Sequence, residues 1–303
     1  MKKILIGILV IDRPKTTRKC LQQLFKNTDR NAFVLCVVDN NSNDETKSML
    51  QEYRKDIDVL IENPFNHGCA FSVNQYLALR MPGMHALDLN ADFHILTDEW
   101  LPLMLKIIDY PDIGIVAGRR PDLFYDPGTG TEPIPGSDLL FSDPGRFQYY
   151  KANIRILKRD DIFLEWDIVN NTIIYPFAMM KDTLIDEIGG MNEQLGIDDI
   201  NYSYRVKLVG KKCVYIPNAV GLQPHGAEPQ NHPEYKANRE LVMMNWLEYE
   251  MQIQNPELLS IYCGSRFIPG SISDKVYQRR SDANYEFFKN YKKRNELLNA
   301  KTL

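Results

Sequence analysis

The chain has 303 residues, 44% of them hydrophobic and 25% charged, so it can bury one large core or two modest ones, and its composition does not indicate disorder. A formal net charge of -4 provides no global field for a polyanion, which argues against nucleic-acid binding without excluding a local basic patch. No stretch approaches the roughly 20 apolar residues of a membrane-spanning helix, and the first apolar run lacks a signal-peptide cleavage site, so we expect a cytoplasmic protein, at most peripheral to a membrane.

Predicted strands and helices alternate over the first ninety residues. The apolar run at 3–11 has the pattern of a strand covered on both faces. Asp12 and Pro14 then offer an N-cap and a first-turn residue for a helix, and Asp44 offers an N-cap for the next one. The expected strands are 3–11, 32–38, 58–62 and 84–89, and the expected helices follow Pro14, begin at Glu45 and follow Gly68.

Strands separated by helices of this length predict right-handed βαβ units and a largely parallel sheet. In such sheets, ligands bind beyond the carboxyl ends of the strands. Polar residues follow the second and fourth predicted strands, at 39–44 and 90–92. The sequence therefore predicts a ligand site formed by these two segments.

The regular pattern breaks at about residue 119. Gly, Pro, Asp and Tyr dominate residues 122–149, which predicts a loop-rich insertion or a small antiparallel excursion over about 119–167. Beyond it, helices are expected at 183–188 and 197–208 and a short strand at 213–216. The expected domains are 1–230 and a helical C-terminal extension at 231–303.

Four segments in the first third resemble glycosyltransferase family 2, which has the GT-A fold. They are the opening strand and loop at 4–14, V-V-D-N-N-S-N-D-E-T at 37–46, N-P-F-N-H-G-C-A at 63–70, and L-D-L-N-A-D at 87–92 with Trp100-Leu101 downstream. The last resembles the N-x-D form found in rhamnosyltransferase-like members. The resemblance spans residues 3–226. It implies an α/β fold of GT-A (Rossmann-like) type, with a mixed, mostly parallel sheet flanked by helices.

The resemblance implies an inverting glycosyltransferase whose donor is a nucleotide-diphosphate sugar. In this family the residue at Asp39 hydrogen-bonds the nucleobase; the alternative for Asp39 is an Asx-turn that caps the following helix. Asn90 would bind sugar hydroxyls or act through water. The implied nucleotide-sugar-binding residues are Ile11, Asp12, Arg13, Asp39, Asn66, Gly68, Asn74, Asn90 and Ala91.

The resemblance also implies a divalent cation, Mn²⁺ or Mg²⁺, on the donor's diphosphate. Asp92 stands at the last position of the family's D-x-D motif and is the expected direct ligand. His225 matches the histidine of the "P-x-A-x-x-x-H" segment and is the expected second ligand, with His232 a weaker candidate. Asp88 is expected to be a paired structural charge rather than a second acid at the site.

The implied catalytic acids open the helix predicted at 197–208. G-G-M-N-E at 189–193 and D-D-I-N-Y-S-Y-R at 198–205 resemble the region that carries the family's general base. Asp199 matches that base, Asp198 replaces the usual Glu, and Asn201 replaces a second Asp. The alternative is a pair of acids that only cap the helix, where the helix dipole favours carboxylates. Arg205 is expected to be a structural partner.

The motifs of several other protein classes are absent from this sequence. It contains no GxGxxG, no P-loop and no G-x-S-x-G, and its five cysteines form no CxxC pair, so a zinc site has no support. The alternatives left open are a catalytically idle GT-A-like module and a nucleotidyltransferase on a related fold. Compatible acceptors are a glycan, a lipid-linked glycan, a protein or a modified nucleic acid, and the chain could form an oligomer.

Overall fold

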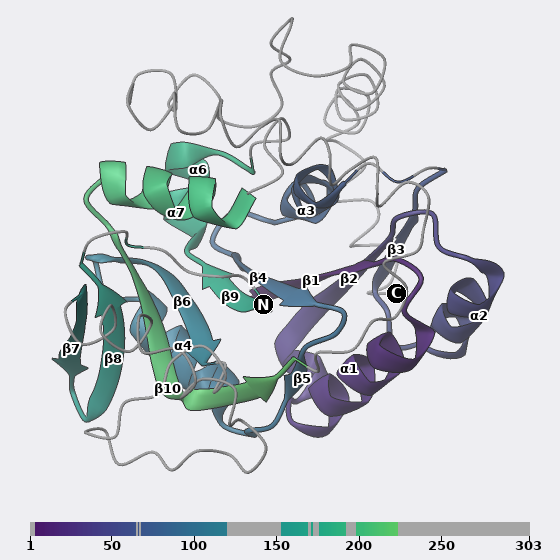
Figure 1. The fold of residues 1–303 in the computed structure, drawn as a ribbon, viewed down its shortest axis with the longest axis horizontal. Coiled ribbons are helices and arrows are strands. Elements are labelled where there is room, and N and C mark those ends of the chain that lie inside the picture. Colours follow the sequence, from purple (N-terminus) through teal and green to yellow (C-terminus); the bar gives the residue numbers. More distant parts are fainter. Residues whose placement is uncertain are drawn as a thin grey trace, which may run out of the picture.

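The computed structural model describes residues 4–64, 66, 68–119, 153–168, 171, 176–191 and 198–223. The predicted extension at 231–303 and most of the predicted insertion lie outside these residues. The described part is one α/β unit built on a single large sheet (Figure 1). None of its helices is long and apolar enough to cross a membrane.

The sheet runs in the order β3-β2-β1-β4-β9-β6-β10-β8-β7. Strands β3, β2, β1 and β4 are parallel neighbours, β6 and β10 are parallel to each other, and β9 runs antiparallel between β4 and β6. The predicted mostly parallel sheet is therefore confirmed. The strands are β1 (Ile4–Val10), β2 (Phe33–Asp39), β3 (Val59–Glu62), β4 (His85–Asn90), β5 (His94–Ile95), β6 (Ile113–Arg119), β7 (Ile154–Arg159), β8 (Ile162–Asp167), β9 (Phe177–Met180) and β10 (Lys212–Leu222).

Helices cover both faces of the sheet (Figure 1). One core packs α1, α2 and α4 against one face, and a second core packs α3, α6 and α7 against the other. Strand β1 contributes to both, because Ile4, Ile6 and Ile8 point into the first core and Leu5 into the second. The helices are α1 (Pro14–Lys26), the 3-10 turn η1 (Arg30–Ala32), α2 (Asp44–Glu52), α3 (Cys69–Leu77), α4 (Trp100–Ile108), α6 (Asp182–Ile188) and α7 (Asp198–Leu208).

Three local predictions need correction. The N-cap of α1 is Arg13, not Asp12, and the N-cap of α2 is Asn43, whose side chain accepts a hydrogen bond from the Thr46 amide, so Asp44 is the first helical residue. Strand β10 is longer than the predicted 213–216, because it continues past register shifts to Leu222. The antiparallel excursion predicted within 119–167 is present at its far end as the β7–β8 pair.

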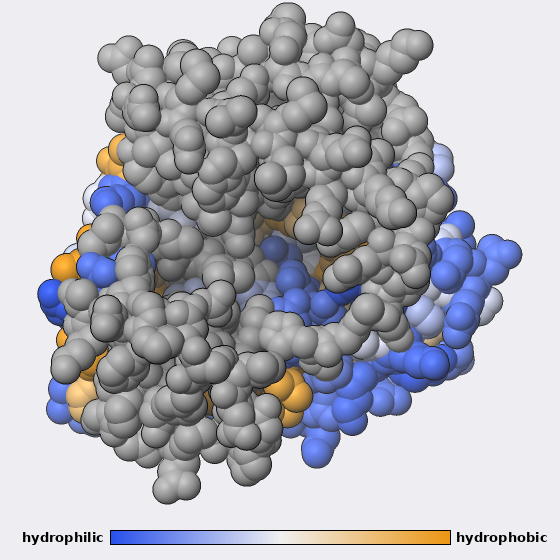
Figure 2. Space-filling model, in the orientation of Figure 1, coloured by the Kyte–Doolittle hydropathy of each residue, from blue (hydrophilic) through white to orange (hydrophobic). Residues whose placement is uncertain are grey.

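The surface over α1 and α2 is strongly hydrophilic (Figure 2). The apolar side chains of α1 point inward, and its Cys20, Leu21 and Leu24 are all buried. The thiols of Cys20, Cys36 and Cys213 lie in the core, and burial raises the pKa of each. These three cysteines act as small apolar core residues.

Gly221 in β10 has no room for a side chain, so we expect Gly221→Ala to lower the free energy of unfolding by about 1–3 kcal/mol. An added Cβ would lie 2.0 Å from Cε1 of Phe93 and 3.0 Å from the carbonyl oxygen of His94. Phe93 is fully buried and stacks on Phe177 with the ring centroids 5.2 Å apart, so its ring cannot move aside freely.

Urea unfolding of Gly221→Ala, Phe93→Leu and the double variant tests this clash. The smaller side chain at 93 should relieve part of the overlap, so the double variant should lose less stability than the sum of the two single losses. Additive losses would contradict a clash between these two residues.

Candidate active site at the carboxyl ends of the parallel strands

The ends of β1 and β2 are joined by a compact hydrogen-bond network. The backbone amide of Asp12 donates to Oγ of Ser42 (3.2 Å), and the amide of Asn43 donates to Oδ1 of Asp12 (2.7 Å). Asp12 is 7% exposed and has a positive φ of 45°, in the left-handed region. Its carboxylate thus shapes the turn before α2, and the donor contact that the family resemblance implies for Asp12 stays a prediction.

Asp39, the last residue of β2, is fully buried and uses its two carboxylate oxygens differently. Oδ1 accepts a hydrogen bond from the Ser42 amide (2.9 Å), so Asp39 holds the turn after β2, but the side chain that caps α2 is that of Asn43 and not that of Asp39. Oδ2 has no hydrogen-bond partner among the described residues. A buried acceptor without a donor is costly, and a ligand N–H would satisfy it. The turn and a nucleobase contact are therefore compatible, because each uses a different oxygen.

A cluster of side-chain amides connects the β2 turn with α3. Nδ2 of Asn40 donates to Oδ1 of Asn66 (2.5 Å), which also accepts from the Gly68 amide (2.8 Å). Asn63 and Gln75 exchange two hydrogen bonds of 2.9 and 2.8 Å. Gly68 has a φ of 85° and is the N-cap of α3. The side-chain oxygen Oδ1 of Asn66 therefore holds the residue that precedes the first turn of this helix.

The sequence alone did not identify Asn40, Asn63 and Gln75 as members of the site. The signal for Gln75 was its place in a helix that is buried on every side: every residue of α3 after Cys69 is buried, Gln75 included. A buried amide needs hydrogen-bond partners, so Gln75 indicates a neighbouring polar group.

Asn74 of α3 holds the Gly-Gly turn that precedes α7. Its Nδ2 donates to the carbonyl oxygen of Met191 (2.9 Å), and its Oδ1 accepts from the Met191 amide (2.7 Å). Gly190 has no Cβ, which is necessary because a Cβ there would lie 2.3 Å from Oδ1 of Asn74. Asn74 is 1% exposed and holds this turn through both atoms of its side-chain amide, and the donor contact that the resemblance implies for it stays a prediction.

Arg205 of α7 holds the same turn from the other side. Its guanidinium donates to the carbonyl oxygens of Ile188 (2.8 Å) and Gly190, and stacks over the ring of Tyr202. The structural role predicted for Arg205 is thus confirmed, with backbone carbonyls as its partners. Asp198 and Asp199 are the first two residues of α7, at the helix start where the sequence placed them.

We expect Asn74→Ala to lower the free energy of unfolding by at least about 2 kcal/mol, because it leaves the buried amide and carbonyl of Met191 without partners. Urea denaturation measures this loss. Ser72→Ala is the matched control: Ser72 lies on the same helix, but its hydroxyl donates only to the Gly68 carbonyl within that helix (3.0 Å). Equal losses in the two variants would contradict a special role for Asn74.

Asp92 lies just beyond the end of β4, where the motif reading placed the metal ligand. Oδ2 pairs with Nη1 of Arg13, and Oδ1 accepts from Nε2 of Gln223 (2.8 Å). The side chain of Asp92 is 13% exposed and that of Arg13 is 35% exposed. Segments far apart in the sequence therefore meet at this carboxylate: the β1–α1 loop, the end of β4 and the residue after β10.

A divalent cation fits the chemistry of Asp92 but not its present hydrogen bonds. Carboxylate oxygens are suitable ligands for Mn²⁺ or Mg²⁺, yet both oxygens of Asp92 already accept hydrogen bonds. Within the described residues no three His, Cys, Asp or Glu side chains gather as a metal site. The predicted ligand His225 and the weaker candidate His232 lie outside those residues. A cation at Asp92 would have to displace Arg13, Gln223 or both.

The remaining predicted donor residues lie at the same edge of the sheet. Asn90 is the last residue of β4, and its backbone amide donates to the carbonyl oxygen of Pro176 (2.9 Å). Its side chain is partly exposed and forms no hydrogen bond with a described residue. Ala91 is buried, and Ile11 is half-buried beside Asp12. This edge therefore carries Ile11, Asp12, Arg13, Asp39, Asn90, Ala91 and Asp92.

Asp88 and His94 are two further titratable residues near the site. Asp88 is 6% exposed within β4, and the hydroxyl of Tyr76, whose pKa is raised by burial and by the Asp88 charge, lies beside it on the α3 face of the sheet. His94 sits in β5 opposite Leu222, and burial lowers the pKa of its imidazole, which keeps it uncharged at neutral pH.

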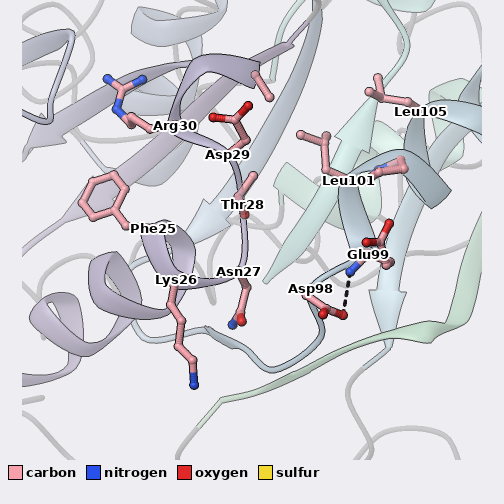
Figure 3. A pocket seen from close by; sticks show the side chains of 12 residues that line it. Phe25, Lys26, Asn27, Thr28, Asp29, Arg30, Asp98, Glu99, Leu101 and Leu105 are labelled. Atoms are coloured by element: carbon pink, nitrogen blue, oxygen red, sulfur yellow. Dashed lines mark hydrogen bonds between the residues drawn. The ribbon is translucent and has the colours of Figure 1, made fainter.

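A groove of about 620 Å³ lies elsewhere on the molecule (Figure 3). Its walls are the end of α1 with the following residues up to Ala32, and the segment from Asp98 to Leu105 at the start of α4. Leu101, Leu105, Asp98 and Glu99 lie on the α4 side, across from the residues at and after the end of α1. None of the predicted site residues lines it.

Comparison with solved structures agrees with this architecture. Mannosyltransferase PcManGT from Pyrobaculum calidifontis, in complex with GDP-Man and Mn²⁺, is 16% identical, with 98% of this chain and 75% of that chain covered and a TM-score of 0.57. S. aureus TarS 1-349 in complex with UDP-GlcNAc is 13% identical, with coverage of 97% and 72% and a TM-score of 0.53. GalNAc-T7 with UDP, GalNAc and Mn²⁺ is 14% identical, with coverage of 95% and 56% and a TM-score of 0.55. These likenesses show the GT-A fold.

At the level of sequence, the chain is 21% identical over 253 residues to the uncharacterized protein y4gI of Sinorhizobium fredii (strain NBRC 101917 / NGR234). The match covers 78% of this chain and 26% of that protein, so the chain spans about a quarter of the length of this relative. The model of the family described as "Glycosyl transferase family 2" matches residues 6–189, which is more than half of the chain. The chain belongs to glycosyl transferase family 2.

Proposed function

We propose that this chain is an inverting glycosyltransferase that binds a nucleotide-diphosphate sugar at the carboxyl ends of β1, β2 and β4. Family membership and the GT-A fold support transfer of a sugar. The solved structures of similar fold include complexes with GDP-Man, UDP-GlcNAc and UDP, two of them with Mn²⁺, which supports a nucleotide donor and a divalent cation.

The observation that carries the donor site is the unpartnered oxygen of Asp39. The carboxylate is fully buried at the end of β2, its Oδ1 is held by the Ser42 amide, and its Oδ2 has no partner in the described part of the chain. An N–H of a nucleobase would donate the missing hydrogen bond to Oδ2 of this carboxylate. The surrounding amide cluster of Asn40, Asn63, Asn66 and Gln75 holds the two loops at this strand end in place.

In this proposal the diphosphate of the donor binds near Asp92. When bound, a divalent cation would neutralise the charge that builds up on the departing nucleoside diphosphate. Asp92 would hold the cation, with His225 as the proposed second protein ligand. Arg13, on the loop between β1 and α1, is the positive side chain of the described residues that contacts Asp92 directly.

The transfer step is assigned to Asp199 at the start of α7. Its carboxylate would take the proton of the acceptor hydroxyl as that oxygen bonds to the anomeric carbon. The bond from the anomeric carbon to the phosphate oxygen breaks on the opposite side, so the configuration inverts and the nucleoside diphosphate leaves. Asn74 and Arg205, which clamp the turn at 188–191, hold the beginning of the segment that leads to this helix. Asp198 is the second acid proposed there.

A thermal-shift panel of UDP, GDP, dTDP, ADP and CDP, and of sugars of each, with and without Mn²⁺, tests this function. We expect at least one of them to raise the melting temperature in a Mn²⁺-dependent way, since a ligand at 100 times its Kd stabilises by about 2.7 kcal/mol. A catalytically idle nucleotide-binding module would show stabilisation without turnover. No stabilisation by any of these compounds would contradict the donor site.

Asp39→Asn is the matched variant for this panel. The amide retains an oxygen for the Ser42 N–H but replaces the unpartnered acceptor Oδ2 by a donor. We expect the affinity for the stabilising nucleotide to fall by about 10- to 100-fold, the worth of a hydrogen bond to a charged group. Unchanged affinity would remove Asp39 from the base site.

A further inference from the structure

Arg13 and Asp92 form an ion pair at the point where the proposed function requires a cation. Arg13 is the N-cap residue of α1, and its side chain has no partner other than Asp92 among the described residues. The pair is partly shielded from solvent, with 13% of the Asp92 side chain exposed. Nε2 of Gln223 donates a hydrogen bond to the second carboxylate oxygen of Asp92. The carboxylate is therefore fully satisfied by protein groups before any ligand arrives.

The charge balance of this pair depends on Asn90. A strict D-x-D motif would leave one carboxylate free for a cation after an arginine had paired with the other. Here position 90 is a neutral amide, so a single negative charge faces a single positive charge. A divalent cation at Asp92 must compete with a guanidinium that the chain itself holds in place.

We infer that Arg13 and the divalent cation exchange places on Asp92, and that Arg13, once displaced, binds the diphosphate of the incoming nucleotide. This inference rests on the proposed function and adds an order to its steps. A guanidinium has several N–H donors in a planar arrangement that matches phosphate oxygens. The diphosphate thus supplies a new partner for Arg13 and further oxygen ligands for the cation at the same time.

The exchange makes binding of the cation and the nucleotide cooperative. Mn²⁺ alone has to break the Arg13–Asp92 pair without compensation, so its affinity for the free protein is low. In the presence of a nucleoside diphosphate the displaced guanidinium is satisfied, so the affinity for Mn²⁺ rises. By linkage, Mn²⁺ raises the affinity for the nucleotide by the same factor.

The test is the affinity for Mn²⁺ alone, measured from the electron paramagnetic resonance signal of free Mn²⁺, for the wild type, Arg13→Gln and Arg13→Lys. We expect Arg13→Gln to bind Mn²⁺ about tenfold more tightly than the wild type, because a charge-assisted hydrogen bond no longer opposes binding. Arg13→Lys keeps the charge but loses the planar geometry and should fall between the two.

The second arm measures the affinity for UDP, GDP, dTDP, ADP and CDP at saturating Mn²⁺ by calorimetry. Arg13→Gln should bind the nucleotide that stabilises the wild type about tenfold more weakly, since the diphosphate loses its arginine contact. The exchange therefore predicts two opposite changes in Arg13→Gln: tighter binding of Mn²⁺ and weaker binding of the nucleotide. A simple loss of folding would lower both.

Arg18→Gln is the matched control. Arg18 lies on the same helix α1 and pairs with Glu52, so its replacement removes the same charge without touching Asp92. Its affinity for Mn²⁺ should equal that of the wild type. Equal or weaker Mn²⁺ binding by Arg13→Gln, with normal Mn²⁺-dependent nucleotide binding by the wild type, would overturn the exchange and leave the proposed function intact. Failure of the wild type to bind Mn²⁺ alone or in the presence of any of UDP, GDP, dTDP, ADP and CDP would overturn both.

Discussion

Asp199→Asn is expected to lower the turnover of the nucleotide-sugar donor by about 10²- to 10⁴-fold, the contribution typical of a positioned general base. The substitution preserves size and removes the negative charge, and with it the ability to accept a proton. Because the proposed base acts on the acceptor and not on the nucleotide, the affinity for the nucleoside diphosphate should remain that of the wild type. Release of the nucleoside diphosphate in steady state measures the first quantity, and calorimetry measures the second.

Asp198→Asn separates this role from a general effect of acids at the start of α7. Both residues lie in the first turn of the helix, where a carboxylate interacts favourably with the helix dipole. If Asp199 is the base, the neighbouring variant should lose clearly less activity. Equal turnover by Asp199→Asn and the wild type would remove Asp199 from the proposed mechanism.

Asp92→Asn is expected to abolish the Mn²⁺-dependent part of nucleotide binding and to lower turnover by about 10²-fold or more. The amide cannot offer a charged oxygen to the cation, and Arg13 also loses its partner. Titration of the nucleoside diphosphate with and without Mn²⁺ should give the same affinity for this variant. In the wild type the two affinities should differ.

The control for Asp92 is another carboxylate that pairs with an arginine. Asp58 accepts a 2.5 Å contact from Arg30 and a hydrogen bond from the Leu35 amide (2.8 Å), at the other end of β2 from Asp39. Asp58→Asn should retain the full effect of Mn²⁺ on nucleotide affinity. A persistent effect of Mn²⁺ in Asp92→Asn would show that the cation binds elsewhere.

The sequence predicted the parallel half of the sheet well because its signals are local. Strand β1 is a continuous apolar run, β4 carries the apolar residues Ala86, Leu87 and Leu89, and Gly68 marks the start of α3 with a backbone conformation that glycine adopts readily. The antiparallel direction of β9 had no such signal. Its four residues, F-A-M-M, are all apolar and buried, and such a run does not indicate whether the strand is parallel or antiparallel to its neighbours. Direction there is set by pairing with β4 and β6.

The helix caps illustrate a second limit. Asn43 and Asp44 are adjacent and both cap helices well, so composition alone does not decide between them. In the structure the choice follows from the turn before α2, in which Asp12 accepts a hydrogen bond from the Asn43 amide. That contact joins residues 31 positions apart.

The candidate site was predictable in its location but not in its internal contacts. Motif order placed Asp39, Asn90 and Asp92 at the ends of β2 and β4, where they lie. The pairing of Arg13 with Asp92 and the clamp of Asn74 on Met191 join residues 79 and 117 positions apart, and no local pattern reports such contacts. Both contacts give predicted donor residues a role toward the protein itself.

The most direct test of a nucleotide and metal site at this edge is crystallography of the protein with Mn²⁺ and the nucleoside diphosphate that stabilises it most. Diffraction data at the manganese absorption edge should place one ion within about 2.2 Å of an Asp92 oxygen. The same map should show a base N–H on Oδ2 of Asp39 and Arg13 turned from Asp92 to the diphosphate. A nucleotide bound away from Asp39, or a manganese peak remote from Asp92, would contradict the account.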